Sequence, residues 1–237
     1  MLRRPLFWVG TVLWIAVIIL FFQMKKEKPQ DAVDTASSKN DQEVKLVPAE
    51  KENLWPEEGL PDFSLTAHTG ETVTKETLIG SPWVVDFIFT YCQGPCPKIS
   101  AQMAVLQEEL KETNVKLITI TVDPETDTVE QLEKYAKAYG ADPERWLMLT
   151  GDHKEIYDLI EKGFLMPVQI DPDADPGSRF VHTTNILYVD EKGVVREKAN
   201  GIIDSEVVAL RRKLVKQYGP EKEEAEAAES EAEPASN

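Results

Sequence analysis

Two cysteines stand where a predicted buried strand gives way to a predicted helix, and this junction constrains the fold more than any other stretch. The run 83–89 is almost wholly apolar, as in a strand that is buried on both faces. Cys92 and Cys96 follow it and are the only cysteines of the 237-residue chain. A strand-to-helix junction opens at the mouth of an α/β sheet, and the free N–H groups of a helix stabilise a thiolate there. We therefore expect chemistry at this junction rather than packing.

The pattern on either side predicts one α/β domain over residues 54–218, with a central mixed sheet flanked by helices and an N-terminal β-hairpin. The hairpin comprises 62–66 and 72–74, and further strands are predicted at 115–122, 146–150, 184–189 and 194–198. Helices are predicted after Cys96, from 128 to 139, and around 156–160. The last predicted helix, 204–218, should turn these side chains inward: Val207, Val208, Leu210, Leu214 and Val215.

The two ends of the chain differ from this domain in composition. An uninterrupted apolar run lies between Arg4 and Lys25, so residues 1–24 are predicted to be a retained membrane anchor. A cleaved signal peptide is the alternative, but nothing resembling Ala-x-Ala follows the run. Residues 25–53 read as a flexible polar tether and 219–237 as an acidic, disordered tail. Because basic residues flank both sides of the anchor, charge alone leaves its orientation open.

The net charge of −16 argues against nucleic acid as a partner, since phosphate binding requires clustered lysine and arginine. The spacing of aspartates in 171–177 resembles a calcium loop. That segment lacks the glycine and the distal glutamate of an EF-hand, so we expect an exposed loop without calcium.

The three histidines differ in context. His68 falls in a predicted hairpin turn and His153 in the first turn of a polar helix, so both are expected at the surface. His182 enters the late strand that should lie beside the central one. By itself, a histidine there is more often a loop residue than a ligand.

A purely structural Cys92–Cys96 disulfide is the simplest alternative to a reactive pair. Such a bridge closes a very short loop and restricts the unfolded chain little, so it would stabilise the fold poorly. The position at a strand end, beside Gly94 and Pro95, favours reactivity instead.

Four motifs, in order along the chain, resemble the Sco/SenC family of copper-binding, thioredoxin-like proteins. They are Asp86-Phe87-x-Phe89-Thr90-x-Cys92-x-x-x-Cys96-Pro97, the stretch 121–128, Trp146-x-x-Leu149-Thr150-Gly151, and Val181-His182 before 187–193. The resemblance covers about residues 60–218 and implies a thioredoxin-like fold. CxxxCP together with a distant histidine is specific, whereas either part alone is weak.

The resemblance implies one copper ion per domain, Cu(I) or Cu(II), bound by Cys92, Cys96 and His182. Two thiolates and an imidazole suit copper on their own chemistry, although zinc accepts the same set. Asp123 is either an outer-shell group of this site or the cap of a turn. Many family members have proline directly after the first cysteine, where this chain has Gln93, and this departure could shift affinity or thiol potential.

The resemblance also implies a metallochaperone, not an enzyme, that serves assembly of the binuclear copper site in subunit II of cytochrome c oxidase. Subunit II and other copper chaperones would be its partners. The expected location is the inner (cytoplasmic) membrane, crossed once, with the soluble domain on the extracytoplasmic, periplasmic side. The alternative is a thiol–disulfide oxidoreductase that keeps the client's cysteines reduced through a redox-active Cys92–Cys96 pair.

Overall fold

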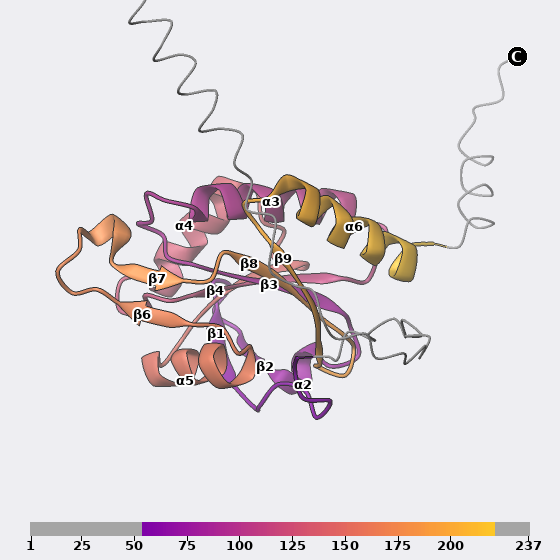
Figure 1. Ribbon diagram of the computed structural model, residues 1–237, viewed down its shortest axis with the longest axis horizontal. Coiled ribbons are helices and arrows are strands. Elements are labelled where there is room, and N and C mark those ends of the chain that lie inside the picture. Colours follow the sequence, from indigo (N-terminus) through magenta and orange to yellow (C-terminus); the bar gives the residue numbers. More distant parts are fainter. Residues whose placement is uncertain (1–53, 221–237) are drawn as a thin grey trace, which may run out of the picture. The chain divides into compact units, whose positions relative to one another are not determined.

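The computed structural model describes residues 54–220, which form a seven-stranded mixed sheet with helices on both faces (Figure 1). The strand order is β2-β1-β5-β4-β3-β8-β9. The α/β class predicted from the sequence is confirmed. The strands are β1 (Ser64–Ala67), β2 (Thr72–Thr74), β3 (Trp83–Ile88), β4 (Lys116–Thr121), β5 (Trp146–Thr150), β8 (Asn185–Val189) and β9 (Val195–Asn200).

The predicted anchor, tether and acidic tail fall outside the described residues, apart from the tail's first two positions. Within residues 54–220, no helix is both long enough and apolar enough to cross a membrane.

Three long helices cover one face of the sheet: α3 (Cys96–Glu109), α4 (Val129–Tyr139) and α6 (Asp204–Tyr218) (Figure 1). The opposite face carries the short α2 (Lys75–Leu78) and α5 (His153–Asp158), which continues as a π-helical turn, η1 (Leu159–Gly163). Each face has its own apolar core, one centred on Met103 and Trp146 and the other on Phe87 and Phe164. The apolar periodicity of the sequence is explained by these two layers.

Strand β3 lies inside the sheet and directs the chain to the cysteines. It pairs parallel with β4 and antiparallel with β8, and all six of its residues are buried. This burial explains why 83–88 is a continuous apolar run instead of an alternating one. Asp86, the single charged residue in the run, is buried with it.

The prediction for the closing helix is wrong at two positions. Val207, Leu210 and Leu214 are buried, as expected, but Val208 and Val215 are 37% and 41% exposed. The buried positions follow the three- and four-residue spacing of one helix face, and only that face meets the sheet. Val208 and Val215 lie on the solvent side.

A second, two-stranded sheet was not predicted. Strands β6 (Val168–Ile170) and β7 (Phe180–His182) pair antiparallel, and the predicted 171–177 loop, with the 3-10 turn η2 (Pro176–Ser178), joins them. The expected late strand beside β3 is present as β8, but it begins at Asn185. His182 therefore lies on the small hairpin β6–β7 and not on the main sheet.

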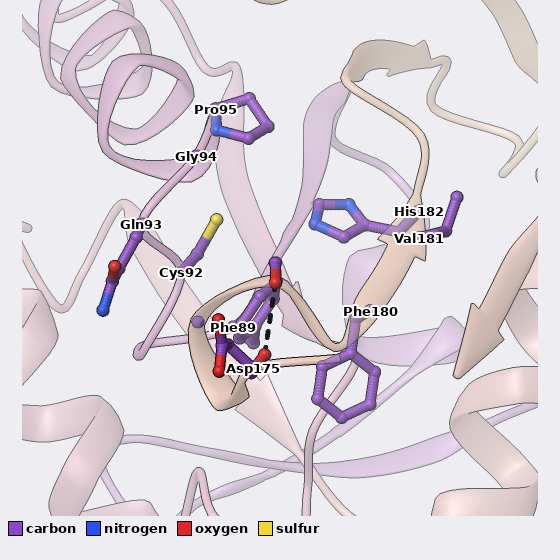
Figure 2. Close-up of a pocket in the computed structure, with 11 residues that line it drawn as sticks. Phe89, Cys92, Gln93, Gly94, Pro95, Asp175, Phe180, Val181 and His182 are labelled. Atoms are coloured by element: carbon purple, nitrogen blue, oxygen red, sulfur yellow. Dashed lines mark hydrogen bonds between the residues drawn. The ribbon is translucent and has the colours of Figure 1, made fainter. Parts of the chain in front are cut away.

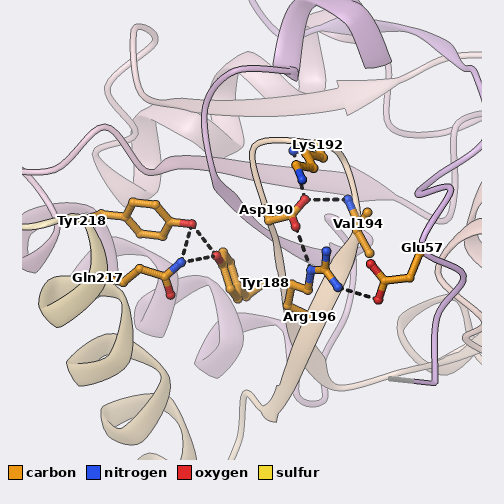
Figure 3. A network of polar contacts seen from close by, with 8 residues as sticks. All are labelled: Glu57, Tyr188, Asp190, Lys192, Val194, Arg196, Gln217 and Tyr218. Carbon is orange, nitrogen blue, oxygen red and sulfur yellow. Dashed lines mark hydrogen bonds and ion pairs between the residues drawn. The ribbon is translucent and has the colours of Figure 1, made fainter. Parts of the chain in front are cut away.

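The turn between β8 and β9 is held by charge as well as by backbone pairing (Figure 3). The Asp190 carboxylate accepts hydrogen bonds from the backbone N–H groups of Lys192 and Val194 and pairs with Arg196 at 2.7 Å. Arg196 also pairs with Glu57 at 2.7 Å. The beginning of the described chain is thereby tied to the far edge of the sheet.

Candidate functional site

The two cysteines lie where α3 begins. Cys92 is half-buried in the loop after β3, and Cys96 is the fully buried first residue of the helix. The backbone N–H groups of Gly94 and Cys96 contribute to lowering the pKa of the Cys92 thiol. The N-terminus of the helix therefore faces Cys92, as expected from the sequence.

The two thiols are free and have different protonation behaviour. The pKa of Cys92 is lowered to about 4, chiefly because the Cys96 thiol donates a hydrogen bond to it, with a further contribution from His182. The pKa of Cys96 is raised, because its proton is held by Cys92 and because the residue is buried. Cys92 is thus a thiolate at neutral pH, and Cys96 is its hydrogen-bond donor.

His182 meets the cysteines from the hairpin β6–β7. Its Nε2 atom is 3.5 Å from the Cys96 sulfur, and its Nδ1 atom is 2.9 Å from the carbonyl oxygen of Thr183. A carbonyl can only accept, so Nδ1 carries a proton and donates it. Nε2, which faces the Cys96 sulfur, is therefore the ring nitrogen that remains to bind a metal ion.

A cavity of about 420 Å³ opens beside these residues (Figure 2). The Cys92 sulfur and the His182 ring both face it, whereas Cys96 does not line it. Its walls are largely apolar. They include Phe89, Gln93, Pro95 and Phe180.

Three contacts hold the hairpin and its loop against the cysteine loop. The Phe180 ring packs on Phe89 with 5.0 Å between ring centroids, and Phe89 also meets the His182 ring edge-on at 5.9 Å. The Gln93 N–H donates a 3.0 Å hydrogen bond to the Gly177 carbonyl. Residues almost ninety positions apart in the sequence are thereby held at one site.

One pair of the proposed ligands, Cys96 and His182, has a separation that would suit a shared ion. For metal–sulfur and metal–nitrogen bonds of about 2.3 and 2.0 Å at a tetrahedral angle, the two ligand atoms lie about 3.5 Å apart. The Cys96 sulfur and His182 Nε2 have that separation. Among residues 54–220, no group of three or more His, Cys, Asp or Glu side chains is arranged to hold a metal ion. The assignment of Cys92, Cys96 and His182 as ligands stays a prediction.

Asp123 lies in the turn after β4, where its carbonyl oxygen accepts hydrogen bonds from the N–H groups of Thr126 and Asp127. The carboxylate that reaches the cysteine loop is that of Asp127, which accepts hydrogen bonds from the Thr90 N–H and from the hydroxyls of Thr90 and Thr121. Sequence analysis included Asp127 only within the 121–128 motif and gave it no role. The outer-shell role of Asp123 stays a prediction.

Asp86 is a further residue that sequence analysis did not single out. One of its oxygens accepts a 2.5 Å hydrogen bond from the Thr119 hydroxyl, and the other, Oδ2, is buried without a partner. Burial raises its pKa to about 7, against a smaller lowering by His182. The sequence feature that could have identified Asp86 is a single charged residue within a run of apolar residues that predicts a buried strand.

The other two histidines, His68 and His153, differ in their exposure to solvent. His153 is exposed, as predicted, and stacks on Tyr157. The prediction that His68 is a surface residue is wrong, because it is 8% exposed and its Nδ1 accepts a hydrogen bond from the Met148 N–H. Strand β1, which His68 follows, pairs with β5, and this pairing covers the turn.

Comparison with known proteins identifies the family of this chain. Residues 53–216 match the model of the SCO1/SenC family. The chain is 35% identical over 143 residues to a SCO1 protein homolog of Bacillus subtilis, covering 59% of this chain and 72% of that protein. It is 30% identical over 131 residues to the human mitochondrial SCO1 homolog, covering 54% of this chain and 42% of that protein. The matched part is thus less than half the length of the human relative.

Solved structures give the same result. A SCO1/SenC family lipoprotein from Bacillus anthracis is 29% identical, with a TM-score of 0.62, covering 67% of this chain and 94% of its own. BsSco, described as a member of the Sco family of cytochrome c oxidase assembly proteins with a disulfide switch, is 31% identical, with a TM-score of 0.59 and coverages of 67% and 92%. Bradyrhizobium japonicum ScoI, solved with copper bound, is 27% identical, with a TM-score of 0.53 and coverages of 65% and 98%. The fold is thioredoxin-like, and the chain belongs to the SCO1/SenC family.

Proposed function

We propose that this protein binds one copper ion through Cys92, Cys96 and His182 and delivers it during assembly of cytochrome c oxidase. The recipient is the binuclear copper site of subunit II. The observation that carries the proposal is the convergence of a thiolate, a buried thiol and an imidazole lone pair beside an open cavity. The copper-bound relative ScoI and the oxidase-assembly relative BsSco support the choice of cargo and pathway.

The chemistry of the donors fits a transferable ion. Thiolates and imidazole suit copper, and three protein ligands leave a position free for a ligand of the recipient. Cys92 is already deprotonated at neutral pH, so only Cys96 must release a proton when the ion enters. Delivery then proceeds by stepwise ligand exchange through the cavity that Cys92 and His182 line.

The proposed location is the cytoplasmic membrane, with residues 1–24 as a single anchor and the copper domain on the periplasmic side. A tether of residues 25–53 would keep the domain near a membrane-embedded client and so raise its effective concentration. Handover from another copper chaperone would load the domain in the same compartment.

Copper titration of the reduced full-length protein tests the proposal. We expect one Cu(I) per chain against a competing chelator, and loss of tight binding in a Cys92→Ser/Cys96→Ser variant. The His182→Ala variant should bind at least about tenfold more weakly. His153→Ala is the matched control, because His153 is exposed on α5 and should leave binding unchanged. Equal stoichiometry and affinity in the double serine variant would refute the proposal.

A second candidate, thiol–disulfide exchange, is favoured by the low pKa of Cys92 beside the buried Cys96. The Cys92 thiolate would attack a client disulfide and form a mixed disulfide. Cys96, after losing its proton, would then displace the client's second thiol. Two electrons pass to the client, which gains two thiols, and a Cys92–Cys96 disulfide forms.

The His182→Ala variant separates the two functions. Copper binding should weaken at least about tenfold, whereas exchange with a model disulfide should persist, with the Cys92 pKa moved upwards because one stabilising partner is gone. The pH dependence of Cys92 alkylation measures that shift. If the His182→Ala variant lost thiol–disulfide exchange and still bound copper, this second function would be excluded.

A further inference from the structure

The C-terminal half of α6 carries a groove that the copper site does not use. This basic groove, of about 660 Å³, is lined by Arg211, Arg212, Val215, Lys216, Gln217, Gly219 and Pro220. Arg212 and Lys216 stand four residues apart, one helical turn, so their side chains neighbour each other. Val215, which the sequence pattern had assigned to the core, lies exposed between them in the chain.

The groove contains positive charge that the described residues leave unpaired. Arg211 pairs with Glu109 at 2.7 Å, and Lys213, just outside the groove, pairs with Glu197. Arg212 and Lys216 make no ion pair with any residue of 54–220, and the buried Arg211 Nε has no partner there. Cations near a helix C-terminus offset the helix dipole. That effect does not account for an exposed valine and an open groove in a protein whose net charge is −16.

The segment that follows the groove has the complementary chemistry. Residues 221–233 contain seven glutamates and one lysine, interspersed with alanines. They begin directly after Pro220, the last residue that lines the groove. The point of exit is fixed, because the Tyr218 hydroxyl bonds to that of Tyr188 on the sheet and Gln217 bonds to both tyrosines (Figure 3).

We propose that the acidic segment 221–233 folds back and docks in the basic groove of α6 within the same chain. Its glutamates would pair with Arg212 and Lys216, and its alanines would cover Val215. Each exposed ion pair is weak by itself, but a segment joined to its site by no intervening linker is present at very high effective concentration. Docking of this kind should be sensitive to salt, because exposed charges are screened.

A carbodiimide cross-linking experiment tests the contact on the full-length protein, because the reagent joins a carboxylate to an amine only where the two touch. We expect mass spectrometry to find cross-links between Lys216 and glutamates of 221–233. They should fall at least about fivefold at roughly 1 M salt, where the Debye length is about 3 Å. The charge-preserving Lys216→Arg variant should lose them, since arginine does not couple.

The same samples give a second measurement, the rate of Lys216 acetylation. In the native chain this rate should be about two- to fivefold lower than in a full-length variant in which all seven glutamates of 221–233 are glutamine. Lys134, which is exposed on α4 and forms no ion pair within residues 54–220, is the reference and should react equally in both proteins.

Three results would overturn the proposal. The first is equal acetylation of Lys216 in the two proteins together with no cross-link to 221–233. The second is cross-links that join isotopically distinct chains in a mixed sample, which would make the occupant a second copy. The third is protection of Lys216 only by vesicles containing anionic lipid, equally with and without the glutamates, which would make the groove a membrane contact.

Discussion

At the scale of the residue, the site depends on unequal burial of chemically similar groups. Cys92 and Cys96 have the same side chain, but one is half-buried under backbone N–H groups and the other is fully buried, so their pKa values move in opposite directions. Sequence analysis could identify both cysteines and His182 from their rarity and spacing. It could not assign the thiolate, because that depends on which sulfur the helix N-terminus faces.

Asp86 was overlooked for a related reason. Sequence analysis named it only as the first residue of the cysteine motif and gave it no role, because its burial and its unpaired oxygen depend on how the chain packs around β3. Its orphaned oxygen and raised pKa lead to a prediction about stability.

We predict that Asp86→Asn changes the pH dependence of unfolding. The pKa of the Asp86 carboxyl is about 7 in the folded protein, whereas an aspartate in the unfolded chain has the ordinary value of 3.8. The folded state therefore holds this proton more tightly, and the native protein loses stability relative to the variant as pH rises from about 4 to 7. The free energy of unfolding of the variant, relative to the native protein, should be higher at pH 8 than at pH 5 by roughly 2 kcal/mol. Urea titrations of the reduced, metal-free proteins measure it, and parallel pH profiles would contradict the prediction.

At the scale of the element, the hairpin β6–β7 was the main omission. Its strands have three residues each, too short for an alternating pattern to stand out, and Pro167 and the aspartate-rich loop interrupt the surrounding sequence. The positions of the longer elements β3, β4, α3 and α6 were predicted correctly, because their apolar runs or helical spacings extend over six residues or more, although two side chains of α6 were placed on the wrong face. The hairpin is held by contacts with Phe89 and Gln93, which only the folded chain brings near.

We predict that Phe180→Ala weakens copper binding although Phe180 is not a ligand. The Phe180 ring packs on Phe89, and its loss should let the hairpin carrying His182 move away from the cysteines. Affinity for Cu(I) should fall about tenfold, as for other residues that orient a ligand. Chelator competition measures the change.

Val181→Ala is the matched control for that experiment, because Val181 lies on the same strand and is 59% exposed. The affinity of the Val181→Ala variant for Cu(I) should stay near that of the native protein. An equal loss in both variants would mean that general loosening of β7, rather than the Phe89 contact, sets the position of His182.

At the scale of the whole molecule, the two ends of the described chain are tied to the same edge of the sheet. The first residues reach the β8–β9 turn through the Glu57–Arg196–Asp190 pairs, and the Leu60 N–H donates to the Gly193 carbonyl. Gly59 approaches this turn so closely that a Cβ atom would lie 2.7 Å from the Gly193 oxygen. This closure joins residues more than 130 positions apart, and no local pattern predicts it.

We predict that Gly59→Ala lowers the free energy of unfolding by about 2–4 kcal/mol. Its φ of +78° disfavours a side chain, and the backbone oxygen of Gly193 blocks the Cβ. Gly70→Ala is the matched control, with a φ of +87° and open space around the Cβ, and should cost only about 1 kcal/mol. Denaturant unfolding measures both. Equal losses would show that conformation alone, without the close approach, determines the cost.

The two sulfurs differ in their access to the cavity, and this difference determines the order in which a copper ion would bind to them and leave them. Cys92 and His182 border the cavity, whereas Cys96 lies behind them, fully buried. An arriving ion must meet the outer pair before the inner sulfur, and a departing ion must leave the inner sulfur before it is free of the outer pair. The order of ligand release during unloading is then the reverse of the order of ligand binding during loading. A recipient needs to contact only the cavity side of the site, where Cys92 and His182 lie, to begin taking the metal.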